Sequence, residues 1–159
     1  MSIDNIHHDV IIEFDGDYSK LKEARVAEGF IQKELAEAIG FDDAVVISRI
    51  ENGVFGLKSQ SYTLLCLLMD IHPNYKLHQK RKYYGSVLID APAKGSEIKQ
   101  FRKNIEHLTQ PKMAKLLGLN DKQIISKYEN DKKRPSIQTW TLWLLITNQH
   151  PYYEILPIS

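Results

Sequence analysis

The stretch QPKMAKLLGLNDKQIISKYEN, residues 110–130, decides the fold, because nearly the same pattern occurs earlier as QKELAEAIGFDDAVVISRIEN, residues 32–52. A shift of 78 residues superposes the two. The match continues downstream, and 15 of the 46 positions in residues 32–77 are identical in residues 110–155. A repeat of this kind indicates that each copy forms the same supersecondary unit. The sequence therefore predicts a tandem duplication.

The repeat also extends upstream, with its register changed by one residue. At an offset of 77, VIIE at residues 10–13 matches VLID at residues 87–90, and Arg25 matches Arg102. We therefore expect a first unit over residues 10–77, a connector over residues 78–86 and a second unit over residues 87–156.

Each unit is expected to begin with a short β-strand, at Val10–Phe14 and at Ser86–Ile89. Both segments are rich in β-branched residues and are bounded by turn residues. Strands this short need a partner. They could pair with each other or with strands of a second protomer.

Four helices are expected to fill the rest of each unit. Ser19 and Ser96 are placed to cap the first helices, and Thr109 is placed to cap the second helix of the second unit. Glycine is suited to end the second helices, at Gly40 and Gly118. The expected ranges are 20–29 and 97–107 for the first helices, starts near Asp43 and Asp121 for the third, and 60–71 and 138–149 for the last. The chain is therefore predicted to be mainly α-helical.

Composition favours a folded cytoplasmic protein without a cofactor. Hydrophobic residues make up 43% and charged residues 26% of the 159 residues, which is typical of a globular protein. The longest apolar run, Leu64–Met69, is too short to cross a bilayer, and the N-terminus lacks the layout of a signal peptide. The single cysteine, Cys66, excludes internal disulfides. No metal-ligand array, catalytic constellation or small-molecule motif accompanies the histidines or Asp42-Asp43, so we expect no enzyme, metal or membrane association.

The two halves differ in charge. Residues 1–85 carry 10 Lys and Arg against 13 Asp and Glu, whereas residues 86–159 carry 11 against 7. An acidic half beside a basic half suggests that the halves have different roles.

Both copies resemble the Cro/CI-type (XRE) helix-turn-helix family. The matching residues are Gln32, Leu35, Ala36, Gly40, Ile47, Ser48, Arg49, Ile50, Glu51, Asn52 and Gly53 in the first copy, and Gln110, Met113, Ala114, Gly118, Ile125, Ser126, Lys127, Glu129 and Asn130 in the second. The resemblance implies two tandem lambda-repressor-like units and a DNA-binding transcriptional regulator, expected to act as a repressor. Both copies have one extra residue between the glycine and the Ile-Ser pair, which alters the turn or the start of the third helix.

The second copy offers the chemistry that double-stranded DNA requires. Lysine can donate to guanine, and glutamine or asparagine can pair with adenine, whereas phosphates attract lysine, arginine and helix starts. We therefore expect base contacts from Asn120, Lys122, Gln123 and Lys127. We expect phosphate contacts from Gln110, Lys112, Ser126, Asn130, Lys132, Lys133 and Arg134.

The first copy is less suited to DNA. Its equivalent positions carry Asp42 and Asp43, and its loop reads Val54-Phe55-Gly56, without cations. Its weaker DNA-contact candidates are Gln32, Lys33 and Arg49. Val45 could contact thymine methyl groups or pack in a protein interface. The Lys80-Arg81-Lys82 cluster in the connector is a further candidate for backbone contacts.

Two arrangements of the chain could bind DNA, and an alternative function is binding to a protein partner. The favoured one is a homodimer that presents two second units to a near-palindromic site, with the first unit helping to dimerise. In the other, one chain places both units on two unlike half-sites. The alternative function is a protein-interaction module, such as an antitoxin-like or antirepressor partner, which the acidic first unit favours.

Overall fold

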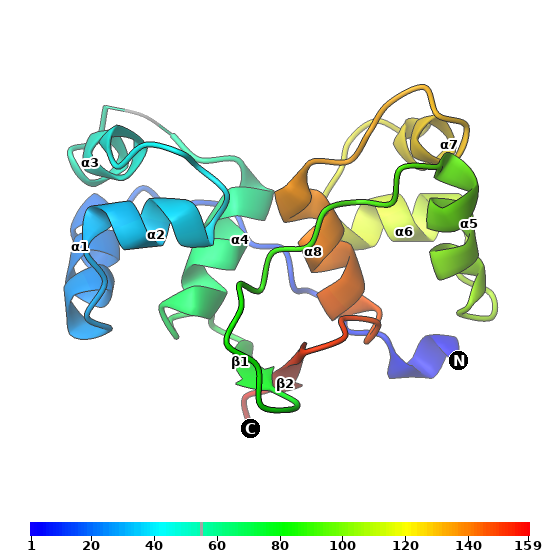
Figure 1. The fold of residues 1–159 in the computed structure, drawn as a ribbon, viewed down its shortest axis with the longest axis horizontal. Helices are drawn as coiled ribbons and strands as arrows, with labels where there is room; N and C mark the ends of the chain where they lie inside the picture. The colour runs from blue at the N-terminus through cyan, green and yellow to red at the C-terminus, as the bar shows by residue number, and fades with distance from the viewer. Residues whose placement is uncertain (55) are drawn as a thin grey trace.

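The computed structural model describes residues 1–54 and 56–159, which form eight α-helices, one 3-10 turn and a two-stranded sheet (Figure 1). The first half contains α1 (Tyr18–Ala27), α2 (Gln32–Ala38), α3 (Val45–Glu51), α4 (Ser59–Leu68) and β1 (Tyr75–Gln79). The second half contains α5 (Gly95–Lys103), α6 (Gln110–Leu116), α7 (Ile124–Glu129), α8 (Ile137–Ile146) and β2 (Tyr153–Pro157), and the 3-10 turn η1 (Ile3–Asn5) precedes both halves. The prediction of a mainly helical chain is confirmed.

The centre of the molecule is the packing of α4 against α8 (Figure 1). Both helices are apolar on nearly every face, so they can only be stable inside a core. Trp140 and Trp143 of α8 are buried, and so is Cys66 of α4. Burial raises the pKa of the Cys66 thiol to about 11, which is typical of a core cysteine.

Strands β1 and β2 pair antiparallel at one end of the molecule, and α3 and α7 lie towards the opposite end (Figure 1). Leu77 lies opposite Ile155 in this pairing. These two residues are 78 positions apart, so the strands meet at equivalent points of the repeat. β1 includes residues 78 and 79, which the sequence assigned to the connector.

The prediction of strands at Val10–Phe14 and Ser86–Ile89 is wrong, because their backbone groups bond to side chains instead of to each other. The carbonyl of Val10 accepts from His72 Nε2 at 2.7 Å, and the amide of Ile12 donates to Thr63 Oγ1 at 3.0 Å. The equivalent segment makes the same contacts, with Val87 bonded to His150 at 2.7 Å and Ile89 to Thr141 at 3.0 Å. Each segment therefore runs extended beside the last helix of its own half, and the strands follow that helix.

The predicted caps of α1 and α5 are also wrong. Asp17 caps α1 by accepting from the Lys20 amide at 3.1 Å, and Ser19 lies inside the helix. α5 begins at Gly95, ahead of Ser96, because the Gly95 amide donates to Asp131 Oδ1 at 2.7 Å. The cap of α5 therefore comes from the loop after α7, 36 residues away.

The remaining boundary signals are confirmed. Thr109 Oγ1 accepts from the Lys112 amide at 3.3 Å at the start of α6. Gly40 and Gly118 adopt φ of 85° and 65°, in the left-handed region that glycine enters without strain. Ile47 and Ile50 of α3 and Ile125 and Tyr128 of α7 are buried.

The N-terminal segment packs on the second half before the chain crosses to the first. The terminal amine donates to the Asn104 carbonyl at 2.9 Å, and the His7 amide donates to the Ile146 carbonyl at 2.9 Å. Within residues 1–54 and 56–159, no helix has the length and apolar character needed to cross a membrane.

Candidate nucleic-acid interface

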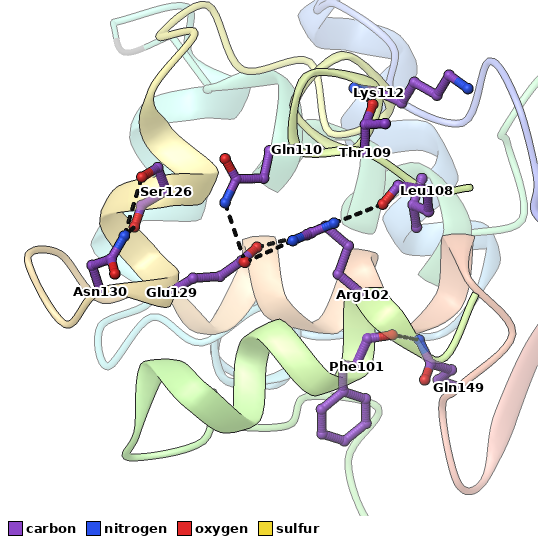
Figure 2. Close-up of polar contacts among 10 residues, drawn as sticks. All are labelled: Phe101, Arg102, Leu108, Thr109, Gln110, Lys112, Ser126, Glu129, Asn130 and Gln149. Carbon is purple, nitrogen blue, oxygen red and sulfur yellow. Dashed lines mark hydrogen bonds and ion pairs between the residues drawn. The ribbon is translucent and has the colours of Figure 1, made fainter. Parts of the chain in front are cut away.

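A buried ion pair holds α5, α6 and α7 together (Figure 2). Arg102 of α5 donates from Nε and Nη2 to the carboxylate of Glu129 in α7, at 2.8 and 2.9 Å. Its Nη1 donates to the Leu108 carbonyl, just before α6, at 2.8 Å. Gln110 Nε2 donates to Glu129 Oε1 at 3.2 Å. Side chains from α5 and α6 therefore meet at the carboxylate of α7, which fixes α7 relative to both helices.

The first half contains the same arrangement. Arg25 donates to both carboxylate oxygens of Glu51, with its shortest contact at 2.9 Å, and to the Phe30 carbonyl at 2.8 Å. Gln32 Nε2 lies 3.5 Å from Glu51 Oε2. The first half thus has the geometry of the second, although its exposed surface differs.

The side chains expected to contact bases lie in the turn before α7 and at its start. Asn120, Lys122 and Gln123 are exposed there, and we call these three residues the reading edge of the second unit. Asp121 lies between them, and its Oδ1 accepts from the Gln123 amide at 2.8 Å. This contact shapes the turn that contains the extra residue.

Lys127 is placed differently from the other three candidates. It is half-buried, and its Nζ lies 2.9 Å from Asp121 Oδ2. Hydrogen bonds from the Lys127 ammonium and from the Gln123 amide lower the pKa of Asp121. The charge of Lys127 is therefore balanced within the protein.

The seven expected phosphate ligands fall into two groups. Lys112, Lys132 and Lys133 are exposed at the surface. The other four have partners within the protein. Gln110 bonds to Glu129, and Asn130 donates to the Ser126 carbonyl and hydroxyl at 2.8 and 3.1 Å. The Arg134 guanidinium donates to the carbonyls of Ala91 and Pro92. Lys112 Nζ also donates to the His107 carbonyl, at 3.4 Å. Arg134 and Gln110 join segments of the chain through their bonds.

In the first half, Lys33 and Arg49 are exposed, and Gln32 is half-buried beside Glu51. Among the described residues, Arg49 takes part in no ion pair. Asp43 Oδ1 accepts from the Val45 amide at 2.9 Å. This contact is equivalent to the one between Asp121 Oδ1 and the Gln123 amide in the second half. Val45 and Val54 are 46% and 74% exposed, so neither packs inside the chain. Phe55 lies outside the described residues.

The Lys80-Arg81-Lys82 cluster directly follows β1, at the end of the molecule opposite α3 and α7 (Figure 1). Arg81 lies over the Tyr152 ring at 6.0 Å, and the Lys80 amide donates to the Tyr152 carbonyl at 2.9 Å. A duplex bound along α3 and α7 would not reach this cluster.

Sequence reasoning gave no role to Arg102 and His150, or to their counterparts Arg25 and His72. The repeat contains the signal for all four, because each is identical at the equivalent position of the other copy and none occupies the exposed reading surface. Among the described residues, no group of three or more His, Cys, Asp or Glu side chains is arranged to hold a metal ion.

Residues 98–150, from α5 to the end of the loop after α8, match the model of the helix-turn-helix family. The match confirms the resemblance to XRE-type helix-turn-helix proteins for these residues. No curated protein and no solved structure matches the chain.

Proposed function

We propose that the chain is a sequence-specific transcription regulator that reads DNA with the turn at the N-terminal end of α7. The observation that carries the proposal is the exposed reading edge, Asn120, Lys122 and Gln123, on the segment that matches the helix-turn-helix family. Lysine there can donate to guanine, and glutamine or asparagine can pair with adenine, in the major groove. The exposed Lys132 and Lys133 in the following loop suit the phosphate backbone.

The Arg102–Glu129 pair supports this function by fixing the reading edge before DNA arrives. The pair is buried and joins α5, α7 and the chain before α6. A reading element that is already ordered loses less conformational entropy on binding than a mobile loop does.

The four expected phosphate ligands with protein partners require a more specific proposal. The side chains of Gln110, Ser126, Asn130 and Arg134 already bond within the protein. We infer that they act on DNA mainly by positioning the backbone, whereas Lys112, Lys132 and Lys133 supply the charge. Lys127 and the first-half residues Gln32, Lys33 and Arg49 have weaker support than the reading edge.

The chain is further proposed to be a tandem duplication, with units over residues 10–77 and 87–156 joined by residues 78–86. Support comes from the paired contacts, since the Arg25–Glu51 and Arg102–Glu129 pairs and the His72–Val10 and His150–Val87 bonds occupy equivalent positions. Such pairs are expected when two copies of one ancestral unit keep the same core.

Regulation is proposed to be repression by occupancy of the site. A promoter covered by the protein would exclude the transcription machinery. A reporter gene placed behind a bound site tests the direction: its expression should fall when the protein is produced, and a rise would indicate an activator.

The first experiment is selection of bound sequences from a random duplex pool at controlled salt. We expect an enriched motif and an affinity that falls steeply with salt, because lysine contacts release counterions. A pool that shows neither enrichment nor salt-dependent binding would contradict the DNA-binding function.

The second candidate is a protein-interaction module, favoured by the exposed Val45 and Val54 and by the acidic Asp42 and Asp43 of the first unit. Exposed apolar and acidic side chains suit a partner protein better than they suit DNA. Failure of the selection experiment, together with a stable complex with a defined protein, would favour this candidate.

A further inference from the structure

The contacts between the two halves are reciprocal. Gln60 of α4 donates from Nε2 to the Leu117 carbonyl at 2.8 Å, and Gln138 of α8 donates to the Ile39 carbonyl at 2.7 Å. Gln138 lies 78 positions after Gln60, and Leu117 lies 78 positions after Ile39. Residue i of one half thus contacts residue j of the other, and j contacts i, which is the signature of a two-fold interface.

Two other features share this symmetry. A Cβ on Gly118 would lie 2.8 Å from Ile11 and 3.6 Å from Gln60, and a Cβ on Gly40 would lie 3.5 Å from Leu88 and 2.8 Å from Gln138. The β1–β2 pairing is centred on Leu77 and Ile155, which are themselves equivalent residues. An approximate two-fold axis therefore passes through the ribbon and between α4 and α8.

This axis relates α3 to α7. The two helices lie far apart on the same side of the molecule, away from the β-ribbon (Figure 1). Dimeric helix-turn-helix proteins place their two reading helices in this relation, so that both meet one face of the duplex. The face of α8 that a second chain would need for an equivalent contact is already covered by α4, since Thr139–Ile146 are all buried.

The two ends differ in chemistry. The positions equivalent to Asn120, Lys122 and Gln123 are Asp42, Ala44 and Val45, which we call the reading edge of the first unit. Val45 is exposed and can contact the methyl group of thymine, and Arg49 is exposed and can reach phosphate. Asp42 and Asp43 repel the backbone. This end of the molecule is therefore suited to weaker DNA binding and to a different base sequence.

We propose that one chain binds one operator as a two-headed monomer, and that the operator has two unlike half-sites in inverted orientation. The strongly specified half-site is read by α7. The second, about one helical turn of DNA away, is contacted by α3 through Val45 and Arg49. This inference rests on the proposed DNA-binding function and adds the form of the operator and the residues that make it asymmetric.

The first test is the stoichiometry of the purified full chain on its selected duplex, measured by analytical ultracentrifugation. We expect one chain per duplex and an asymmetric motif. Two chains per duplex, or a perfect inverted repeat, would overturn this inference and leave the DNA-binding function intact. The absence of any enriched motif would instead overturn the DNA-binding function and this inference with it.

The second test converts one head into the other. The variant Asp42→Asn, Ala44→Lys, Val45→Gln gives the first unit the reading edge of the second. We expect the selected motif to become an inverted repeat of the α7 half-site. The variant should bind this repeat at least about tenfold more tightly than the wild type does, because each mismatched base pair lowers affinity by about that factor or more. An unchanged asymmetric motif in a variant that keeps the wild-type circular dichroism spectrum would overturn the inference.

The matched control places the same exchange in the second unit, as Asn120→Asp, Lys122→Ala, Gln123→Val. Loss of the strongly specified half-site is expected here. If this variant still selects the wild-type motif, α7 is not the stronger head and the assignment of the two ends is wrong.

Discussion

At the scale of single residues, Glu129 links α7 to the two helices before it. It is buried, and it accepts hydrogen bonds from Arg102 and from Gln110. A buried charge that loses its counter-charge is strongly destabilising, whereas replacing both partners with apolar residues can be nearly neutral. Removal of one member of the pair should therefore destabilise the protein more than replacement of both members does.

We expect Glu129→Gln to lower the free energy of unfolding by about 3–5 kcal/mol, because it leaves the Arg102 guanidinium buried without a counter-charge. Chemical denaturation followed by circular dichroism measures this change. Glu51→Gln is the matched variant in the first half, where Arg25 is left in the same position. The double variant Arg102→Met, Glu129→Leu should recover most of the loss. A loss below about 1 kcal/mol in both single variants would contradict the argument.

At the reading edge, base contacts and phosphate contacts should separate by their effects on specificity. Lys122→Ala or Gln123→Ala is expected to relax the sequence preference and cost about 1–3 kcal/mol at the affected base. Lys132→Ala or Lys133→Ala should weaken binding to all sequences and flatten the salt dependence. Affinities for selected and random duplexes at several salt concentrations test this. Equal losses on both duplexes for all four variants would refute the division.

Sequence reasoning identified the residue types of this surface, but it did not show which of their side chains bond to other parts of the protein. Arg134 and Lys132 look alike in the sequence, yet Arg134 donates to the carbonyls of Ala91 and Pro92, more than 40 positions away. Lys127 is balanced by Asp121 through the shape of the turn. The partners of Arg134 are set by tertiary structure, and the local sequence pattern holds no information about them.

At the scale of elements, a buried histidine joins each extended segment to the loop after the last helix of its half. His72 Nε2 donates to the Val10 carbonyl, while its Nδ1 accepts from the amides of Asn74 and Tyr75 at 3.0 and 3.1 Å. His150 makes the equivalent contacts to Val87, Tyr152 and Tyr153. Only the neutral imidazole can donate from one nitrogen and accept at the other. These bonds also explain why the expected strands do not form.

This geometry predicts a loss of stability in mild acid. Burial lowers the pKa of His72 and of His150 below the ordinary value of 6.5. Below that pH the unfolded chain binds protons that the folded chain excludes, so stability is full above about pH 6.5 and falls as the pH decreases towards the folded-state pKa values. Thermal unfolding between pH 5 and pH 8 should show a decreasing Tm on the acid side.

The control is the double variant His72→Gln, His150→Gln. It should be less stable than the wild type at pH 8, because glutamine cannot make all three contacts, but its Tm should depend less on pH between 8 and 5. If wild type and variant lose the same Tm over this range, the two histidines do not cause the acid sensitivity.

The helices of each unit followed from the sequence because their signals are local: apolar residues at helical spacing, a capping threonine and glycine turns. Gly118 and Thr109 are in the expected places for this reason. The strands were misplaced because Tyr75–Gln79 needs a partner at Tyr153–Pro157, and the sequence gives no local sign of that pairing. The repeated sequence pattern agrees with the element order, in which each half has four helices followed by a strand.

At the scale of the whole molecule, the placement of one half on the other could not be predicted. It depends on Gln60 and Gln138, which bond to carbonyls 57 and 99 positions away. The N-terminal residues add a further link, because the His7 amide bonds to the Ile146 carbonyl in the second half before the chain enters the first. Helices α4 and α8 therefore belong to one continuous core that neither half completes alone.

A shared core predicts that the two halves unfold together. Trp140 and Trp143 both lie in α8, so tryptophan fluorescence reports on the second half and the central interface, whereas far-ultraviolet circular dichroism reports on all the helices. We expect the two signals to give one coincident transition in urea, since opening either half would expose apolar faces of α4 and α8. The variant Gln60→Ala, Gln138→Ala removes the reciprocal bonds and should lower the midpoint while keeping the transitions coincident. A circular dichroism transition in the wild type that precedes the fluorescence transition would mean that the first half unfolds by itself, and the two heads would then lack the fixed spacing that a bipartite operator requires.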